Sequence, residues 1–464
     1  MPMPMSPTDA VFLIMESREH PMHVGGLQLF EPPAGADARD MCRLFHDLSA
    51  NDDVAPMFRR RARRSIATGG LWAWEDDDQF DIEHHMRHSA LPRPGRVLEL
   101  LALCSRLHST LLDRHRPLWE THLIEGLADG RLAVYSKLHH AVMDGVATAR
   151  WIQRVLSADP GARNMPAPWA QPPERPGVID TVDHGSVADV PADVWRALRT
   201  VASEAAGLPG ALIRTVNRAI HEQATSLSFS APKTILNVRI TGARRFAGQS
   251  WPIDRFRAIA RGSGGTLNDI VLATCSGALR GYLMGLDELP DTPLIAMVPV
   301  ALRTRDRDRQ AGNAVGAVMC NLGTHLTDPA ARLACVQQSM AAGKQALSGM
   351  SSVQILVMSG LGMSPLALEP LLHIHGVLRP PFNLIISNVP GSRVPLYWNG
   401  ARLAGVYPLS VPVDGQALNI TSTSYADQMA FGLTGCRRSV PHLQRLLDHL
   451  DHELGDLEKA VGIS

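Results

Sequence analysis

The chain has 464 residues, of which 45% are apolar, and a chain of this size can form two substantial hydrophobic cores. Its 45 basic and 45 acidic side chains cancel, so the overall charge gives no reason to expect nucleic-acid binding. No apolar run reaches the length of a membrane span, and no basic start with a long apolar stretch marks a leader. We therefore expect a cytoplasmic protein that is not integral to a membrane. Its six cysteines lack CxxC spacing and are expected to be reduced and mostly buried.

Two polar clusters precede position 90. The densest basic run comprises Arg59, Arg60, Arg61, Arg63 and Arg64. It could attract the phosphates of a ligand or a lipid surface, although a solvated face is the simpler interpretation. The second cluster, Glu83-His84-His85 with His88, has spacing found among metal ligands, but nothing nearby completes a ligand set. We therefore expect no metal there.

The most informative stretch is His139-His140-Ala141-Val142-Met143-Asp144-Gly145, an HHxxxDG pattern. A strand is predicted over 132–138, and an amphipathic helix after Gly145, where apolar residues recur at helical spacing up to Leu156. The histidines therefore fall at a junction between rigid elements, where catalytic groups are often placed.

A neutral imidazole can take a proton from an alcohol or thiol near pH 7. Because adjacent side chains on an extended backbone point in different directions, we predict His140 as the general base and His139 as its positioning neighbour. Asp144 could contact His140 or pair with an arginine. Its structural alternative is the N-cap of the following helix.

The middle of the chain is predicted to be a linker. Prolines recur between Ser157 and Gly177, which excludes regular structure. Two basic amphipathic helices are then expected over 195–205 and 212–220, packed between domains or lying on an anionic lipid surface. The domain prediction is 1–160, a linker region over 161–230, and 231–464.

Strands are predicted in the last third over 294–300, 383–389, 417–425 and 428–433, with a turn at Ala426-Asp427 and a closing helix from Leu443 to Leu457. The Met-rich run 358–363 is expected to be core or a flexible apolar wall. Asn268 is a candidate donor to an oxyanion, with capping of a helix from Asp269 to Leu279 as the alternative. The mixture of elements predicts an α/β fold.

Several sequence blocks support a family resemblance. They are Ser6-Pro7-Thr8-Asp9, Met22-His23-Val24-Gly25, 85–92, 113–120 with its Pro117-Leu118-Trp119-Glu120, Thr266-Leu267-Asn268-Asp269, 298–303, Gly312-Asn313 and Ser387-Asn388-Val389-Pro390-Gly391. The HHxxxDG motif resembles the signature of the chloramphenicol acetyltransferase and condensation-domain superfamily. Together with the blocks above, it makes the chain similar to the bacterial wax ester synthase/diacylglycerol acyltransferases.

This resemblance implies two chloramphenicol-acetyltransferase-like domains with an active-site tunnel between them. His140 would deprotonate an acceptor hydroxyl, which attacks an acyl-CoA thioester directly, without an acyl-enzyme. Asp144 would be salt-bridged to an arginine, for which Arg303 is the candidate. Gly145, Asn268 and Arg303 are the expected substrate-binding residues, and no cofactor or metal is expected, since coenzyme A arrives as part of the substrate.

The predicted function is transfer of a fatty acyl group from acyl-CoA to a long-chain alcohol or diacylglycerol, giving wax esters or triacylglycerol. Peripheral contact with the inner membrane or lipid inclusions is a further expectation. Two alternatives stay open: a condensation-type enzyme that uses a carrier-protein thioester, and a non-catalytic lipid-droplet-binding protein. The chain contains no recognisable carrier domain, which weighs against the first.

Overall fold

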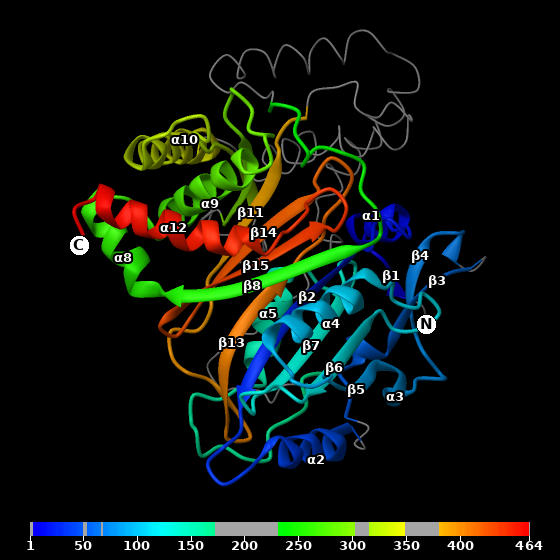
Figure 1. The fold of residues 1–464 in the computed structure, drawn as a ribbon. Coiled ribbons are helices and arrows are strands. Elements are labelled where there is room, and N and C mark those ends of the chain that lie inside the picture. Colours follow the sequence, from blue (N-terminus) through cyan, green and yellow to red (C-terminus); the bar gives the residue numbers. More distant parts are fainter. Residues whose placement is uncertain are drawn as a thin grey trace.

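The computed structural model describes residues 3–49, 53–65, 68–171, 231–301, 315–348 and 380–463. These residues form two six-stranded mixed sheets, a small three-stranded sheet and surrounding helices (Figure 1). The predicted α/β class is therefore confirmed. Within the described ranges, no helix is long and apolar enough to cross a membrane.

The first large sheet combines strands from both ends of the chain. Its order is β12 (Tyr397–Trp398), β13 (Ala401–Leu409), β2 (His23–Glu31), β7 (Leu132–His139), β6 (Trp119–Glu125) and β5 (Met86–Ala90). Only the β5–β6 pair in this sheet is parallel. Because β13 pairs with β2, a segment near residue 400 extends the sheet that carries the HHxxxDG motif.

The second large sheet lies entirely within the later part of the chain. Its order is β10 (Val315–Asn321), β9 (Ile295–Ala301), β11 (Leu384–Val389), β14 (Leu418–Tyr425), β15 (Gln428–Cys436) and β8 (Arg244–Pro252). β11 runs parallel to both of its neighbours. The strands predicted near 294–300, 383–389, 417–425 and 428–433 are all present, and Ala426 has φ 49° in the expected turn.

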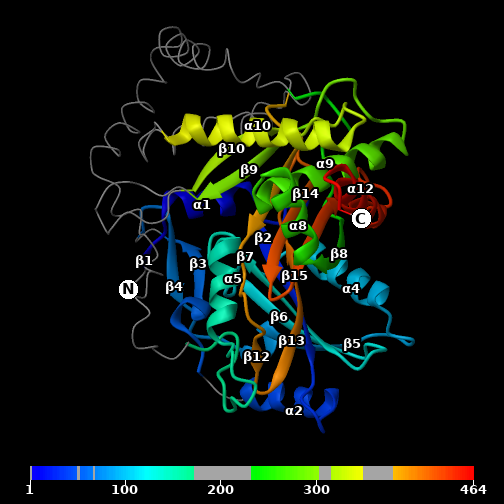
Figure 2. The same cartoon turned by 90° about the vertical axis from the view of Figure 1, so that its left-hand side faces the viewer.

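Helices surround both sheets. They are α1 (Pro7–Met15), α2 (Ala38–Ser49), α3 (Ile82–His85), α4 (Val97–Ser109), α5 (Gly145–Arg154), α8 (Ile253–Ser263), α9 (Leu267–Met284), α10 (Pro329–Ser348) and α12 (Arg445–Ala460). Figure 2 shows α10 running along β9 and β10, and α9 packs against α8, α10 and α12. The apolar side of these four helices forms one core with the second sheet.

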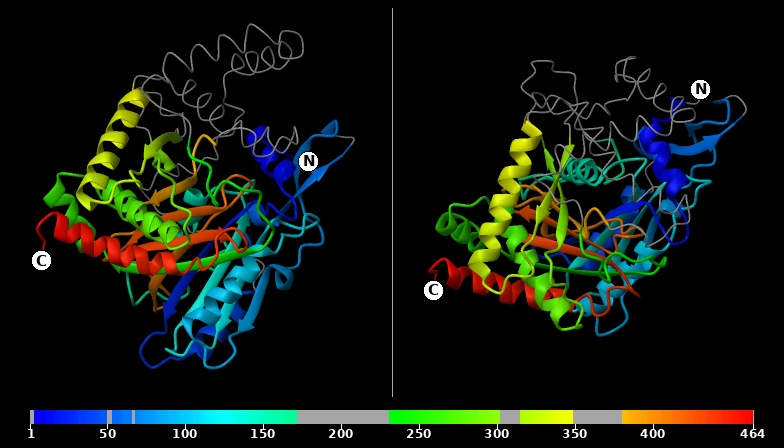
Figure 3. Two further views of the ribbon diagram at one scale, coloured as in Figure 1. Left: turned by 45° about the horizontal axis from the view of Figure 1, so that its top comes forward. Right: turned by 90° about the horizontal axis from the view of Figure 1, so that it is seen from above.

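α4 connects the two halves of the molecule (Figure 3). The Ser105 hydroxyl accepts a hydrogen bond from the Phe246 amide at 2.9 Å, and the Ser109 hydroxyl accepts one from the Arg244 amide at 2.8 Å. Both amides belong to β8 at the edge of the second sheet. The helix therefore holds one sheet against the other through specific polar contacts as well as apolar packing.

The small sheet contains the basic run. It has the order β1 (Met3–Pro4), β4 (Trp72–Asp76) and β3 (Arg60–Arg64), with a short 3-10 helix over Pro56–Arg59 before it. Arg60 pairs with Asp76 and Arg63 with Glu75, while Arg64 stacks on Trp72. Glu75 and Asp76 of β4 thus neutralise part of the positive charge of the basic run.

The linker region is described only in part. From Ser157 to 171 the chain contains turns and one isolated bridge but no helix or extended strand, as its prolines predict. Trp169 in this stretch is buried against Phe45 and Trp119. The two amphipathic helices predicted over 195–205 and 212–220, and the Met-rich run 358–363, lie outside the described residues.

Candidate active site

The HHxxxDG motif begins at the last residue of β7, as the predicted strand-to-helix junction requires. The His139 amide donates to the Leu118 carbonyl at 2.9 Å, and the His140 amide donates to the Met22 carbonyl at 2.8 Å. Leu118 and Met22 immediately precede β6 and β2, the two strands that flank β7. The backbone of the two histidines is therefore held from both sides.

His139 is completely buried and in a defined tautomer. Its Nδ1 accepts a hydrogen bond from the Ala141 amide at 3.1 Å, so the ring proton belongs on Nε2. That nitrogen lies 3.5 Å from Glu16 Oε1, and Glu16 Oε2 accepts a 2.7 Å bond from Arg114 Nε. Burial alone would raise the pKa of Glu16, but His139 and Arg114 outweigh it and hold this pKa below its ordinary value. The arrangement suits His139 for positioning rather than proton transfer to substrate.

Replacing Glu16 with glutamine should lower kcat about 10-fold, because the His139 ring loses the carboxylate that orients it and the HH turn loosens. KM for the acyl donor should change much less, since Glu16 is buried and cannot contact substrate. Glu19→Gln, three residues further along the same segment, is the matched control. Steady-state kinetics would contradict this positioning role if Glu16→Gln raised KM and left kcat unchanged.

His140 differs from its neighbour because the residue is half-buried rather than completely buried. It stacks on Phe12 of α1, with ring centroids 4.1 Å apart and an interplanar angle of 23°. No hydrogen bond from another described residue reaches its ring nitrogens. Burial lowers the pKa of His140 below its ordinary value, against the opposing effect of the nearby Asp144 charge. The lowered pKa favours the neutral form of the ring.

Asp144 caps the helix that follows the motif. Its Oδ1 accepts a 2.7 Å hydrogen bond from the Ala147 amide at the start of α5, as the N-cap alternative predicts. Open space lies beside Gly145, where an added Cβ would meet nothing within 4 Å. Arg303, the candidate partner of Asp144, lies outside the described residues.

Asn268 does not cap its helix, so that alternative is wrong. Thr266 is the N-cap of α9 and forms a capping box with Asp269, because a hydroxyl at this position reaches the third amide of the helix. Asn268 lies in the first turn of α9, and its Oδ1 accepts a 3.4 Å bond from Asn388 Nδ2. The contact joins two sequence blocks and leaves the Asn268 amide group able to donate elsewhere.

Glu120 ends the Pro117-Leu118-Trp119-Glu120 block and lies in β6, opposite Lys137 of β7, where it has a structural role. It contacts Lys137 Nζ and His122 Nε2, each at 3.2 Å, and Lys137 also donates to the carbonyls of Leu107 and Thr110 at the end of α4. His122 and Lys137, with Arg87, lower the pKa of Glu120 to about 2 although burial opposes this. The block therefore supports the strand that ends at His139.

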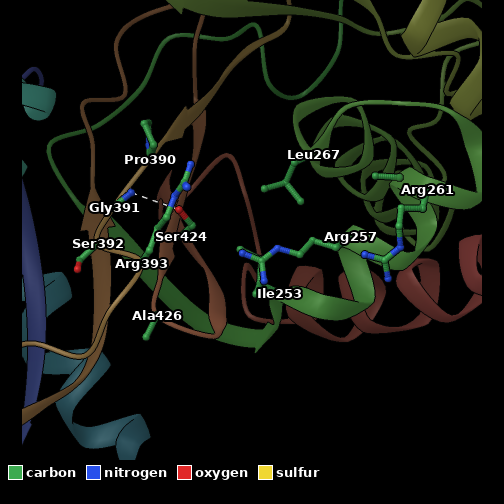
Figure 4. Close-up of a pocket in the computed structure, with 11 residues that line it drawn as sticks. Ile253, Arg257, Arg261, Leu267, Pro390, Gly391, Ser392, Arg393, Ser424 and Ala426 are labelled. Atoms are coloured by element: carbon green, nitrogen blue, oxygen red, sulfur yellow. Dashed lines mark hydrogen bonds between the residues drawn. The ribbon is translucent and has the colours of Figure 1, made fainter.

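A cavity of about 500 Å³ is lined by Leu267, which precedes Asn268, and by the Pro390–Arg393 loop, which follows β11 (Figure 4). Its walls come from α8, the first residue of α9, the loop after β11 and the end of β14. Three arginines line it: Arg257, Arg261 and Arg393. Arg257 pairs with Asp254 at 3.0 Å, whereas in the described part of the chain Arg261 and Arg393 have no ion-pair partner. The cavity therefore presents positive charge to a ligand.

Sequence reasoning missed several residues that contact the histidines or line the cavity. Phe12, Glu16 and the cavity arginines were not singled out, and Arg114 was noted only within its block. Of these residues, only Arg114 could have been found from the sequence, because it lies within the block 113–120. Phe12 and Glu16 are distant in sequence from HHxxxDG and reach it through the packing of α1, whereas the cavity arginines lie on α8 and in the loop after β11.

Family models account for most of the chain. The wax ester synthase/diacylglycerol acyltransferase catalytic domain matches residues 5–271, and the C-terminal domain of the same family matches 311–458. The chain belongs to the wax ester synthase/diacylglycerol acyltransferase family. It is therefore an acyltransferase, and the predicted family resemblance is confirmed.

Individual relatives agree with this assignment. A chain named as a diacylglycerol O-acyltransferase from Mycobacterium tuberculosis is 50% identical over 461 residues, which cover 99% of both chains. A second one from that species is 46% identical over 473 residues, covering 100% of this chain and 92% of the relative.

Solved structures support the fold. A wax ester synthase/diacylglycerol acyltransferase from Marinobacter aquaeolei is 40% identical with a TM-score of 0.77, covering 99% of this chain and 100% of that one. A condensation domain of the calcium-dependent antibiotic synthetase shares the fold at 15% identity and a TM-score of 0.60, covering 100% and 97%. The expected superfamily fold is thereby confirmed.

Proposed function

We propose that this acyltransferase moves a fatty acyl group from acyl-CoA to the hydroxyl of a long-chain alcohol or diacylglycerol, forming wax esters or triacylglycerol. The observation that supports this proposal most directly is His140, a half-buried residue whose pKa is lowered by burial and whose ring nitrogens receive no hydrogen bond from another described residue. Its neighbour His139 is locked in one tautomer beside it. The names of the relatives and the family model support the class of acceptor.

In the proposed reaction His140 takes the proton of the acceptor hydroxyl as the oxygen attacks the thioester carbonyl. The tetrahedral intermediate then collapses, the carbon–sulfur bond breaks, and the coenzyme A sulfur leaves with the proton returned from His140. Asn268 is proposed to donate its side-chain amide to the oxyanion, since its Oδ1 is already engaged by Asn388. Asp144 shapes the turn as a helix cap, and its pairing with Arg303 remains part of the proposal.

We place the phosphates of coenzyme A at the arginine-lined cavity. Arg261 and Arg393 have guanidinium groups without described carboxylate partners, and guanidinium groups pair well with phosphate. The pantetheine arm, which separates the phosphates from the thioester, would run from this cavity toward the proposed acyl-transfer site at His140.

The acceptor is proposed to come from a membrane or lipid inclusion by peripheral contact. α1, which stacks Phe12 on His140, exposes Val11 and Ile14 to solvent at 47% and 64% of their surface. Apolar side chains on the helix that covers the base are suited to contact with lipid.

The double substitution Arg261→Ala and Arg393→Ala should raise KM for palmitoyl-CoA about 10-fold or more, because two charge-assisted contacts to phosphate are lost. The change in kcat should be small. Wild-type KM should also rise with salt more steeply than that of the variant. Arg437→Ala with Arg438→Ala removes the same charge elsewhere, and an equal rise of KM in that control would contradict a local phosphate site.

Thiol release from palmitoyl-CoA, with product identification by thin-layer chromatography, tests the proposed function. Release that depends on hexadecanol or diacylglycerol and yields the matching ester is the expected result, and the better acceptor decides between wax ester and triacylglycerol. Turnover with a carrier-protein thioester but not with free palmitoyl-CoA would instead support the condensation-type alternative. No turnover with either donor would support the lipid-binding alternative.

A further inference from the structure

A group of three potential metal ligands lies away from the HHxxxDG motif. Cys42 comes from α2, His88 from β5, and Glu125 is the last residue of β6. β6 runs antiparallel to β7, with Trp119 opposite Leu138 and Ile124 opposite Ala133. Glu125 is therefore at the end of the sheet opposite His139, and this group is separate from the active site.

The ligand atoms are spaced as a tetrahedral metal site requires. Cys42 Sγ lies 3.7 Å from His88 Nε2 and 3.8 Å from Glu125 Oε2, and His88 Nε2 lies 3.3 Å from Glu125 Oε1. Zinc bonds of about 2.3 Å to sulfur and about 2.1 Å to nitrogen or oxygen, at tetrahedral angles, separate the ligand atoms by roughly 3.4–3.6 Å. The two short distances to Glu125 use different oxygens, so its carboxylate must turn to present one oxygen to both partners. One ligand atom from each residue lies within 4.8 Å of the others, which small side-chain movements could close around one ion.

A fourth residue supports the histidine. His46 lies one turn after Cys42 on α2, and its Nε2 is 3.2 Å from His88 Nδ1. Metal-binding histidines commonly donate their second ring N–H to an acceptor that orients the ring. His46 is in the position of that acceptor, because it contacts the nitrogen of His88 that does not face Cys42 and Glu125.

We propose that Cys42, His88 and Glu125 bind a divalent transition-metal ion, with Zn²⁺ best suited to this sulfur, nitrogen and oxygen set. Cys42 would bind as a thiolate, releasing its proton to solvent, and a water molecule would complete the coordination. His88 and Glu125 expose 31% and 32% of their side chains, which gives an ion a route to the buried sulfur. The ion would connect α2 to the β5–β6 edge and stabilise that edge.

The competing interpretation is a plain ion pair between His88 and Glu125, to which the Cys42 thiol adds a weak hydrogen bond. The two interpretations differ in one respect: only the metal site engages the sulfur as a thiolate. Cobalt can report this difference, because thiolate-to-Co²⁺ charge transfer absorbs in the near ultraviolet.

The test is titration of chelator-treated full-length protein with Co²⁺, followed by competition with Zn²⁺ against a chromophoric indicator. Wild type should develop the charge-transfer band and lose it on addition of Zn²⁺. Cys42→Ser should show no band, and His88→Gln and His46→Ala should bind Zn²⁺ about 10–100-fold more weakly. Cys335→Ser, which alters a half-buried cysteine outside this group, should behave like wild type.

Far-UV circular dichroism establishes that each variant is folded. If Cys42→Ser does not fold, His88→Gln carries the test, since its side chain is partly exposed. An undiminished band in Cys42→Ser, or equal Zn²⁺ affinity in wild type and His88→Gln, would overturn the proposal.

Discussion

Replacing His140 with alanine should reduce acceptor-dependent thiol release from palmitoyl-CoA by about 10²–10⁴-fold, the usual contribution of a general base. The ring is the proton acceptor in the proposed reaction, and no other described residue hydrogen-bonds its nitrogens, so its removal breaks no polar contact in the fold. It does remove the stacking contact with Phe12, and the thermal transition should therefore shift only slightly.

The exposed His115 is the matched control, and His115→Ala should retain wild-type activity. His140→Gln adds a second test, because it keeps part of the side-chain volume while removing the base. If folded His140→Ala released thiol as fast as wild type, His140 would not be the base.

Replacing Lys137 with methionine should lower the free energy of unfolding by about 3–5 kcal/mol, the usual cost of breaking a buried ion pair from one side. Lys137 is completely buried, and its ammonium group satisfies the Glu120 carboxylate and two carbonyls at the end of α4. Methionine fills similar volume but donates no hydrogen bond, so the Glu120 charge and both carbonyls lose a partner.

Urea denaturation followed by circular dichroism measures this loss. Among the described residues the exposed Lys459 pairs only with Asp456, also in α12, and Lys459→Met should change stability by no more than about 0.5 kcal/mol. A loss below about 1 kcal/mol for Lys137→Met would mean that His122 and Arg87 compensate Glu120 without the lysine.

The sequence predicts the local elements of this protein better than their assembly. Hydrophobic periodicity correctly locates β7, α5 and α12, because each element buries one side with a characteristic spacing. The same patterns do not reveal that β13 joins the sheet of the first half, since alternation marks a strand without specifying its partner.

In the candidate site, too, the sequence predicts local features better than contacts between distant segments. HHxxxDG places His140 at the end of a strand, and capping chemistry accounts for Asp144. Glu16 reaches His139 only because α1 packs over the end of β7, and Cys42 and Glu125 meet although 83 positions separate them. Such contacts depend on tertiary packing, which residue spacing within one segment does not encode.

The pH dependence of kcat/KM for acyl transfer by the wild-type protein tests the central claim most directly. The base must be neutral, and burial lowers the pKa of His140, so activity should be constant around neutrality and fall on acidification with an apparent pKa below 6.5. If kcat/KM did not fall on acidification as one group is protonated, or fell with an apparent pKa clearly above 6.5, the result would contradict His140 as the neutral base.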